Sequence, residues 1–316
     1  GSLYAFDAVP GYVAYSLHEA QMDSGGLRGI RILQDYLYGA GGREMMLGFR
    51  ASDAKLEPMH FAADGEFRLG DPNPVRQEAI APALKRLAEE RFDAAMFYDG
   101  DADRLDFYLG DGTYLAASFV YAAVLPLILR RRRPEAPRVL VDVKTNPLAA
   151  LEMARCGARV GLIRNGHSHI KHTMYANRDT IGTVEESAHY YEDFHLEGRR
   201  YCTENTLYFS LLAARLLREN PDRLRAMAEI QSHACRAREW GHKFLSDAQR
   251  QSALDAVTDY FTARGASVLE RLPDGSDLEG TMMRAGLPFE ITEDVAIPDS
   301  WIQVSQRPSQ SEDGLA

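Results

Sequence analysis

The sequence F-Y-D-G-D-A-D-R at residues 97–104 decides how this chain is interpreted. It follows an apolar stretch, residues 94–98, that predicts a buried β-strand. It then places three carboxylates at alternate positions: Asp99, Asp101 and Asp103. Carboxylates this close repel one another unless a cation lies among them, and hard oxygen ligands beside a phosphate suit Mg²⁺. Arg104 adds the planar guanidinium that phosphate oxygens accept. The run therefore predicts a magnesium loop at the carboxyl end of a strand, where open α/β sheets place their ligands.

Two other structures share features of this run. A solvated acidic turn between two strands is a common fate of Asp and Gly clusters, and spacing alone leaves it open. A calcium-binding EF-hand loop also begins D-x-D-x-D. That loop requires Gly where Arg104 stands and Glu where Gly110 stands, and it lies between helices, so it is excluded.

Composition limits the classes of protein to consider. The 316 residues suffice for two or three domains of roughly 100–150 residues each. A net charge of −10 argues against nucleic-acid binding, because phosphate backbones need a basic face. The three cysteines lie far apart without a C-x-x-C pair, which favours a reducing cytoplasm and neither disulfides nor zinc. The longest apolar run, residues 115–129, is interrupted by Pro126 and is shorter than the ~20 residues of a membrane span. We therefore expect a buried helix there, no membrane partner and a cytoplasmic location.

Strands alternate with helices for most of the length, which predicts layered α/β domains. We expect two consecutive α/β domains of mixed sheets with helices on both faces, followed by a smaller α+β domain. The predicted boundaries are 1–117, 118–228 and 229–316, with Ser118 as N-cap of the apolar helix.

Two further patterns predict structural roles. The G-A-G-G turn at residues 39–42 is not G-x-G-x-x-G and lacks an acidic residue placed for a ribose, so a dinucleotide site is weakly supported. The four arginines at 130–133 predict a solvated helix end, favourable to the helix dipole and stopped by Pro134.

The metal loop resembles a known family. D-G-D-A-D-R at 99–104 is similar to the D-G-D-G-D-R loop of the α-D-phosphohexomutases, the phosphomannomutase/phosphoglucomutase family, with Ala102 in place of Gly. The segment V-E-E-S-A-H at 184–189 resembles the family's G-E-x-S-G-H loop, which holds the sugar hydroxyls in the third domain. Both of that loop's glycines are replaced here, so the backbone is expected to be less free.

The resemblance implies roles for this second segment. Glu185 and Ser187 would bind the ring hydroxyls, because a carboxylate accepts two sugar protons and a serine both donates and accepts. His189 would act as a general acid or base, because imidazole titrates near neutrality. For the pentapeptide alone, a polar strand end at the surface is an open alternative.

Two more stretches resemble parts of the family. V-D-V-K at 141–144 and G-H-S-H-I-K at 166–171 are similar to third-domain segments whose lysine and first histidine face the substrate, which implies Lys144 and His167. R-P-S-Q-S-E at 307–312 is similar to the R-P-S-N-T-E phosphate loop of the fourth domain. It implies an anion cradle made by Arg307, Ser309, Gln310 and Ser311.

As a whole, the resemblance implies a Mg²⁺-dependent isomerase that interconverts hexose 1-phosphate and hexose 6-phosphate, of mannose or glucose, through a hexose 1,6-bisphosphate. Its catalytic residues would be Arg104, His189 and Lys144. The match covers the family's second and third domains and a shortened fourth. No T-A-S-H-N-P serine loop occurs in these residues, so a phosphoserine domain is an expected partner and the chain alone is expected to be inactive.

Two other functions remain open at this point. A haloacid-dehalogenase-like phosphatase also places D-x-D after a strand, but it prefers Thr or Val where Asp103 stands. A non-catalytic phosphosugar-binding or regulatory protein would keep the same loops without turnover.

Overall fold

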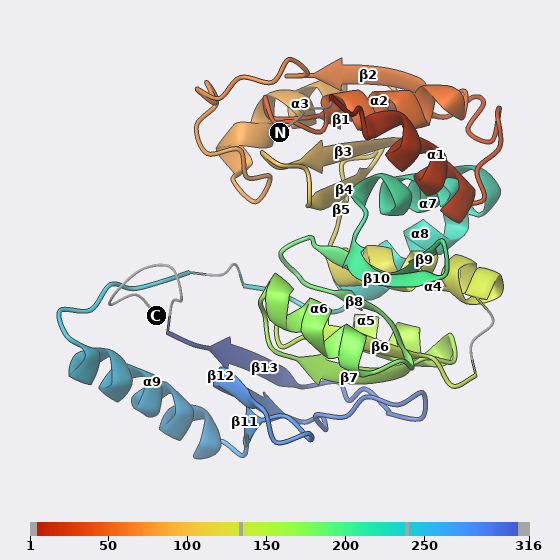
Figure 1. Ribbon diagram of the computed structural model, residues 1–316. Coiled ribbons are helices and arrows are strands. Elements are labelled where there is room, and N and C mark those ends of the chain that lie inside the picture. The colour runs from red at the N-terminus through yellow and green to blue at the C-terminus, as the bar shows by residue number, and fades with distance from the viewer. Residues whose placement is uncertain (1–4, 133–134, 238–239, 309–316) are drawn as a thin grey trace, which may run out of the picture. The chain divides into compact units, whose positions relative to one another are not determined.

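The computed structural model describes residues 5–132, 135–237 and 240–308, and the chain divides into two compact units (Figure 1). The first unit comprises Gly1–Pro134 and Val184–Ser232, and the second comprises Glu135–Thr183 and His233–Ala316. The division into three domains predicted above stays a prediction.

The first unit contains a five-stranded mixed sheet with the order β2-β1-β3-β4-β5. Its strands are β1 (Arg31–Asp35), β2 (Lys55–Met59), β3 (Ala94–Tyr98), β4 (Leu105–Leu109) and β5 (Tyr114–Leu115). The three strands β2, β1 and β3 are parallel, and β4 returns antiparallel to β3. Every residue of β3 is buried, as expected for a central strand with both faces covered.

Helices cover both faces of this sheet (Figure 1). They are α1 (Val9–Glu19), α2 (Gly42–Ala51), α3 (Gln77–Glu89), α4 (Ala117–Arg132), α7 (Thr206–Glu219) and α8 (Pro221–Ser232). On one face, α3 packs its apolar side against Leu33, Ala95 and Phe97. On the other, the Tyr98 hydroxyl donates to Ser210 Oγ of α7 at 3.2 Å. The alternation along β3 thus sends successive side chains to opposite helix layers.

Two local predictions for the apolar helix are wrong. Helix α4 begins at Ala117, so Ser118 is buried inside the first turn and is not the N-cap. The arginines at its end are not simply solvated: Arg131 and Arg132 both pair with the fully buried Glu192. Their side chains are only 18% and 11% exposed, because charged partners drawn from other elements surround the helix end.

Five further strands form the second mixed sheet, with the order β10-β9-β8-β6-β7. They are β6 (Arg138–Asp142), β7 (Arg159–Ile163), β8 (Thr180–Val184), β9 (Tyr190–Leu196) and β10 (Arg199–Glu204). Strands β6 and β7 are parallel, and β9 and β10 form an antiparallel hairpin. The β6–β7 crossover contains α5 (Pro147–Arg155), where Asn146 accepts a hydrogen bond from the Leu148 N–H, and α6 (His167–Ala176) follows β7.

The second unit ends in a small antiparallel sheet of β11 (Ser267–Arg271), β12 (Asp277–Ala285) and β13 (Ile302–Gln306). Helix α9 (Asp247–Thr262) joins it through the Gln306 amide, which donates to the Leu254 carbonyl at 2.8 Å. Two mixed α/β sheets and a smaller α+β part confirm the predicted fold class.

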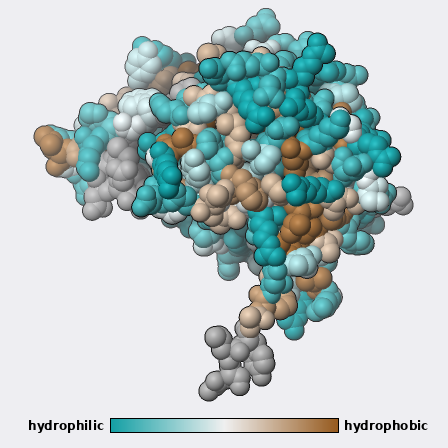
Figure 2. Space-filling model, turned by 90° about the horizontal axis from the view of Figure 1, so that it is seen from above, coloured by the Kyte–Doolittle hydropathy of each residue, from teal (hydrophilic) through white to brown (hydrophobic). Residues whose placement is uncertain are grey.

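The face seen in Figure 2 is mostly hydrophilic, with small hydrophobic groups between charged and polar side chains. Among the residues placed by the structure, none of the helices has the length and apolar character needed to cross a membrane.

Candidate active site

The three aspartates of the metal loop come together at the carboxyl end of β3. Each offers one carboxylate oxygen, and these three atoms all lie within 4.8 Å of one another. Asp99 is buried, Asp103 is half-buried and Asp101 is exposed, so the cluster opens to solvent on one side. A tight turn makes this possible, because the Ala102 N–H donates to the Asp99 carbonyl at 3.2 Å.

The charges within this cluster are unequal. Burial, and then the charge of Asp103, raise the pKa of Asp99 to about 7. The hydrogen bond with His189 holds the pKa of Asp103 below its usual range. Arg104 lies beside Asp99, with its Nε 3.2 Å from Oδ2 and its backbone N–H donating to Oδ1 at 3.2 Å. A buried carboxyl with a raised pKa gains from an added cation, and three hard oxygens are a set that Mg²⁺ accepts. The residues therefore fit a divalent cation.

The segment predicted for sugar recognition lies directly beside the metal loop. Arg104 and His189 form an antiparallel β-bridge, and the Leu105 N–H donates to the Ala188 carbonyl at 3.0 Å. His189 Nε2 lies 3.2 Å from Asp103 Oδ1, and its Nδ1 lies 3.0 Å from Ser187 Oγ. One imidazole thus joins the two segments that sequence analysis singled out.

The imidazole of His189 is more basic than usual. Burial lowers its pKa, but the hydrogen bond and charge of Asp103, with the charge of Glu185, outweigh burial and raise it overall. A histidine that keeps its proton to higher pH is a candidate proton donor. Glu185 is itself buried and accepts a 2.8 Å hydrogen bond from the Tyr191 hydroxyl, a partner that sequence analysis missed.

The two alanines that replace family glycines both have left-handed backbone. Ala102 has φ 60° and Ala188 has φ 73°. For a residue with a Cβ this conformation costs roughly 1–2 kcal/mol relative to ordinary backbone. Both turns therefore keep a backbone shape suited to glycine, and Ala102 and Ala188 adopt it under strain.

The glycine turn at 39–42 has a role that its sequence did not predict. The Ala40 N–H donates to the Gly100 carbonyl at 2.8 Å. A Cβ added at Gly39 would lie 2.6 Å from the Asp99 carbonyl oxygen, and one at Gly41 would lie 2.3 Å from the Ala102 Cβ. The turn thus packs directly against the metal loop, which requires residues without side chains. The available signal was a run of small residues at the end of a strand parallel to β3.

The other predicted residues belong to the second unit, near the end of β6. The Asp142 carboxylate accepts from the Lys144 N–H at 3.2 Å and from the Asn165 amide at 2.8 Å, so the ends of β6 and β7 are tied together. His167 is exposed at the start of α6. Ser305 Oγ donates to the Val143 carbonyl at 2.7 Å, which attaches β13 beside Lys144.

Strand β13 leads directly to Arg307, so this unit brings Lys144 and the start of the predicted phosphate loop to one edge. Ser309, Gln310 and Ser311 lie outside the described residues.

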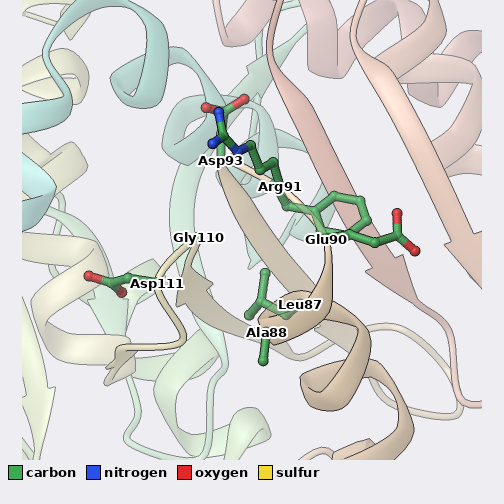
Figure 3. A pocket seen from close by; sticks show the side chains of 8 residues that line it. Leu87, Ala88, Glu90, Arg91, Asp93, Gly110 and Asp111 are labelled. Carbon is green, nitrogen blue, oxygen red and sulfur yellow. The ribbon is translucent and has the colours of Figure 1, made fainter.

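A separate pocket of about 580 Å³ lies at the opposite end of β3 from the carboxylates. Figure 3 shows its lining, which comes from the end of α3, the loop before β3 and the turn after β4. It contains none of the residues predicted for the site, so we do not assign it to the chemistry.

Comparison with known proteins agrees with these motifs. The family model "Phosphoglucomutase/phosphomannomutase, alpha/beta/alpha domain II" matches residues 10–112, which include the metal loop and the glycine turn. A phosphomannomutase from Vibrio cholerae is 24% identical over 164 residues, 52% of this chain and 34% of that protein. The chain is thus similar to the α-D-phosphohexomutase family, most specifically over residues 10–112.

Solved structures show the same fold. A phosphoglucomutase/phosphomannomutase family protein from Burkholderia thailandensis aligns with TM-score 0.70 and 19% identity, covering 90% of this chain and 58% of that one. An N-acetylphosphoglucosamine mutase from Aspergillus fumigatus, solved with GlcNAc-6P and magnesium, aligns with TM-score 0.54 and 12% identity, covering 100% and 63%. This chain thus spans less than two thirds of the length of each of these relatives.

Proposed function

We propose that this chain carries the metal and sugar loops of a Mg²⁺-dependent phosphohexomutase that interconverts hexose 1-phosphate and hexose 6-phosphate, with mannose or glucose as the sugar. The observation that carries this proposal is the β-bridge between Arg104 and His189, which joins the carboxylate cluster to the Glu185–His189 segment. The magnesium and GlcNAc-6P in the Aspergillus fumigatus relative support the same ligand chemistry here.

In this proposal, Asp99, Asp101 and Asp103 would hold Mg²⁺, whose charge when bound would offset that of the phosphoryl oxygens. Arg104, held beside Asp99, would balance charge that develops during phosphoryl transfer. His189, whose raised pKa keeps it protonated to higher pH, would give or take the proton of a sugar hydroxyl.

The sugar and its second phosphate would meet other side chains. Glu185 and Ser187 would accept and donate hydrogen bonds to ring hydroxyls. Lys144, His167 and Arg307, from the second unit, would contact the substrate or its non-reacting phosphate. Ser309, Gln310 and Ser311 remain predicted parts of that phosphate loop.

We further propose that phosphoryl transfer needs a phosphoserine domain as partner. These 316 residues contain no T-A-S-H-N-P loop. A covalent nucleophile divides a difficult transfer into two easier steps, and without it the phosphoryl group would have to pass directly between two sugars. The residues described here would then bind hexose phosphates and hexose 1,6-bisphosphate but not interconvert them alone.

Calorimetry beside a turnover assay tests both parts. Purified chain with Mg²⁺ is titrated with glucose 1-phosphate and mannose 1-phosphate, and is separately supplied with glucose 1-phosphate plus catalytic glucose 1,6-bisphosphate. We expect binding without formation of glucose 6-phosphate. Turnover at about 1 s⁻¹ or faster, the ordinary enzyme range, would contradict the need for a phosphoserine domain. Failure to bind either hexose phosphate would contradict the proposed function itself.

A further inference from the structure

A buried Asp–His pair lies at the carboxyl end of β1, next in the sheet to the strand that leads into the metal loop. Asp35 is fully buried, and its Oδ1 lies 2.8 Å from Nδ1 of His60, which follows β2. The other oxygen, Oδ2, is buried with no hydrogen-bond partner among the described residues. Burying a carboxylate costs free energy unless the group is well paired. We therefore expect Asp35 to have a functional role that explains why it is buried here.

The pair holds a strained turn. Asp35 Oδ1 also accepts the Leu37 N–H at 3.0 Å, and Leu37 and Tyr38 both have left-handed backbone, with φ 48° and 62°. Two consecutive bulky residues in this region persist only where their surroundings fix them. His60 also stabilises this turn directly. Its carbonyl accepts a hydrogen bond from the Tyr38 N–H at 3.0 Å, and its ring centroid lies 4.9 Å from that of Tyr38.

This turn packs against the metal loop. The left-handed backbone of Leu37 and Tyr38 reverses the chain, so that Gly39 and Ala40 lie against residues 99 and 100. The Ala40 N–H donates to the Gly100 carbonyl at 2.8 Å, and Gly39 approaches so closely that a Cβ would lie 2.7 Å from that same oxygen. Gly100 stands between the first two carboxylates of the cluster, so its position sets their spacing.

We propose that Asp35 and His60 form a positioning pair for the metal loop. The pair fixes the conformation of the Leu37–Tyr38 turn. Through the hydrogen bond from Ala40 to Gly100, the turn then fixes the position of Gly100 and so the spacing of Asp99 and Asp101. Residues that orient metal ligands from behind change affinity by about 10–100-fold when they are altered. The proposal rests on the proposed function insofar as the loop binds a divalent cation.

The test combines cation affinity with a measurement that needs no metal. Mg²⁺ and Mn²⁺ affinities are measured by calorimetry for the chain and for Asp35→Asn, His60→Ala and His60→Asn. Amide hydrogen exchange at Leu37 and Ala40 is measured in the metal-free chain. In His60→Asn, the side-chain amide nitrogen takes the place of Nδ1 as donor to Asp35. Ile32→Val is the matched control, because Ile32 is buried in the same strand but makes no contact of this kind.

We expect Asp35→Asn and His60→Ala to weaken cation binding about tenfold and to speed exchange at Leu37 and Ala40. His60→Asn should restore most of both, and Ile32→Val should change affinity less than twofold. Unchanged affinity and exchange in folded Asp35→Asn would overturn the proposal, as would a loss in Ile32→Val of equal size.

If Asp35→Asn does not fold, the contrast between His60→Ala and His60→Asn decides, and equal losses in both overturn the pair. A chain that binds no divalent cation would instead defeat the proposed magnesium site. In that case faster Ala40 exchange in the variants would still support the hold of the pair on the turn, and unchanged exchange would overturn it.

Discussion

Replacing Gly41 by Ala tests how tightly the glycine turn packs against the metal loop. Gly41 has φ −78° and ψ −1°, a conformation that any residue adopts, so alanine causes no backbone strain at this position. The added Cβ would lie 2.3 Å from the Ala102 Cβ, well inside the ~3.5–4.0 Å of ordinary carbon contacts. Overpacking of this kind typically costs about 1–3 kcal/mol, and we expect the upper half of that range because both groups belong to backbone-fixed turns.

A second substitution identifies the source of that loss. Ala102→Gly removes the opposing methyl group and relieves left-handed strain of roughly 1–2 kcal/mol, against a glycine entropy cost of about 0.5–1 kcal/mol. Alone it should stabilise the fold slightly. Combined with Gly41→Ala, it should recover at least about 1.5 kcal/mol, a coupling expected only of residues in contact.

Urea unfolding followed by circular dichroism measures all three variants. Gly11→Ala is the matched control, since no heavy atom lies within 4 Å of the Cβ it would add in helix α1. It should gain about 0.5–1 kcal/mol from reduced chain entropy. The reasoning is refuted if Gly41→Ala costs less than about 0.5 kcal/mol, or if its cost is the same with Ala102 and with Gly at that position.

Three further predictions concern the site and the thiols. Glu185→Gln should weaken hexose-phosphate binding and leave inorganic phosphate binding unchanged; equal weakening of both in calorimetry would contradict a role in hydroxyl recognition. Beryllium fluoride should leave Asp99 unmodified in mass spectra, whereas a phosphatase nucleophile would be labelled. Burial raises the pKa of Cys202 to about 11, so the folded state prefers the thiol, and stability that this residue contributes at lower pH is lost as pH rises through about 11. At pH 8 a thiol reagent should therefore modify the exposed Cys235 quickly and Cys202 only on unfolding, and equal rates would count against this burial.

Local patterns in the sequence predicted much of the fold. The strand at 94–98 has the predicted bounds, because an apolar run of this length is a strong local signal. The hairpin between β9 and β10 also has a local sequence signal, because Glu197-Gly198 at its turn both adopt positive φ, a conformation that glycine favours.

Elements without such signals were missed. Strand β2, K-L-E-P-M, contains Pro58 and only partly buried or exposed residues, features that argue against a strand. It forms at the edge of the sheet, where both features are tolerated. Helix α1 was not predicted, because its amphipathic pattern begins with Pro10-Gly11, a pair typical of turns.

The candidate site likewise combines features that the sequence predicted with contacts that it did not predict. The proximity of the three aspartates follows from their alternate spacing, but the bridge between Arg104 and His189 joins residues far apart in the chain. The packing of the glycine turn on Gly100 likewise depends on two strands lying side by side. Such contacts follow from tertiary packing and leave no local pattern in the sequence.

The measurement that tests the central claim most directly is the Mg²⁺ affinity of the chain and of its Asp101→Asn variant by calorimetry. Asp101 is the exposed member of the cluster, so its substitution should leave the fold intact. The account predicts one Mg²⁺ per chain and at least tenfold weaker binding in Asp101→Asn, a loss of about 1.4 kcal/mol or more. Equal Mg²⁺ affinity in the two proteins, with both folded, would contradict it.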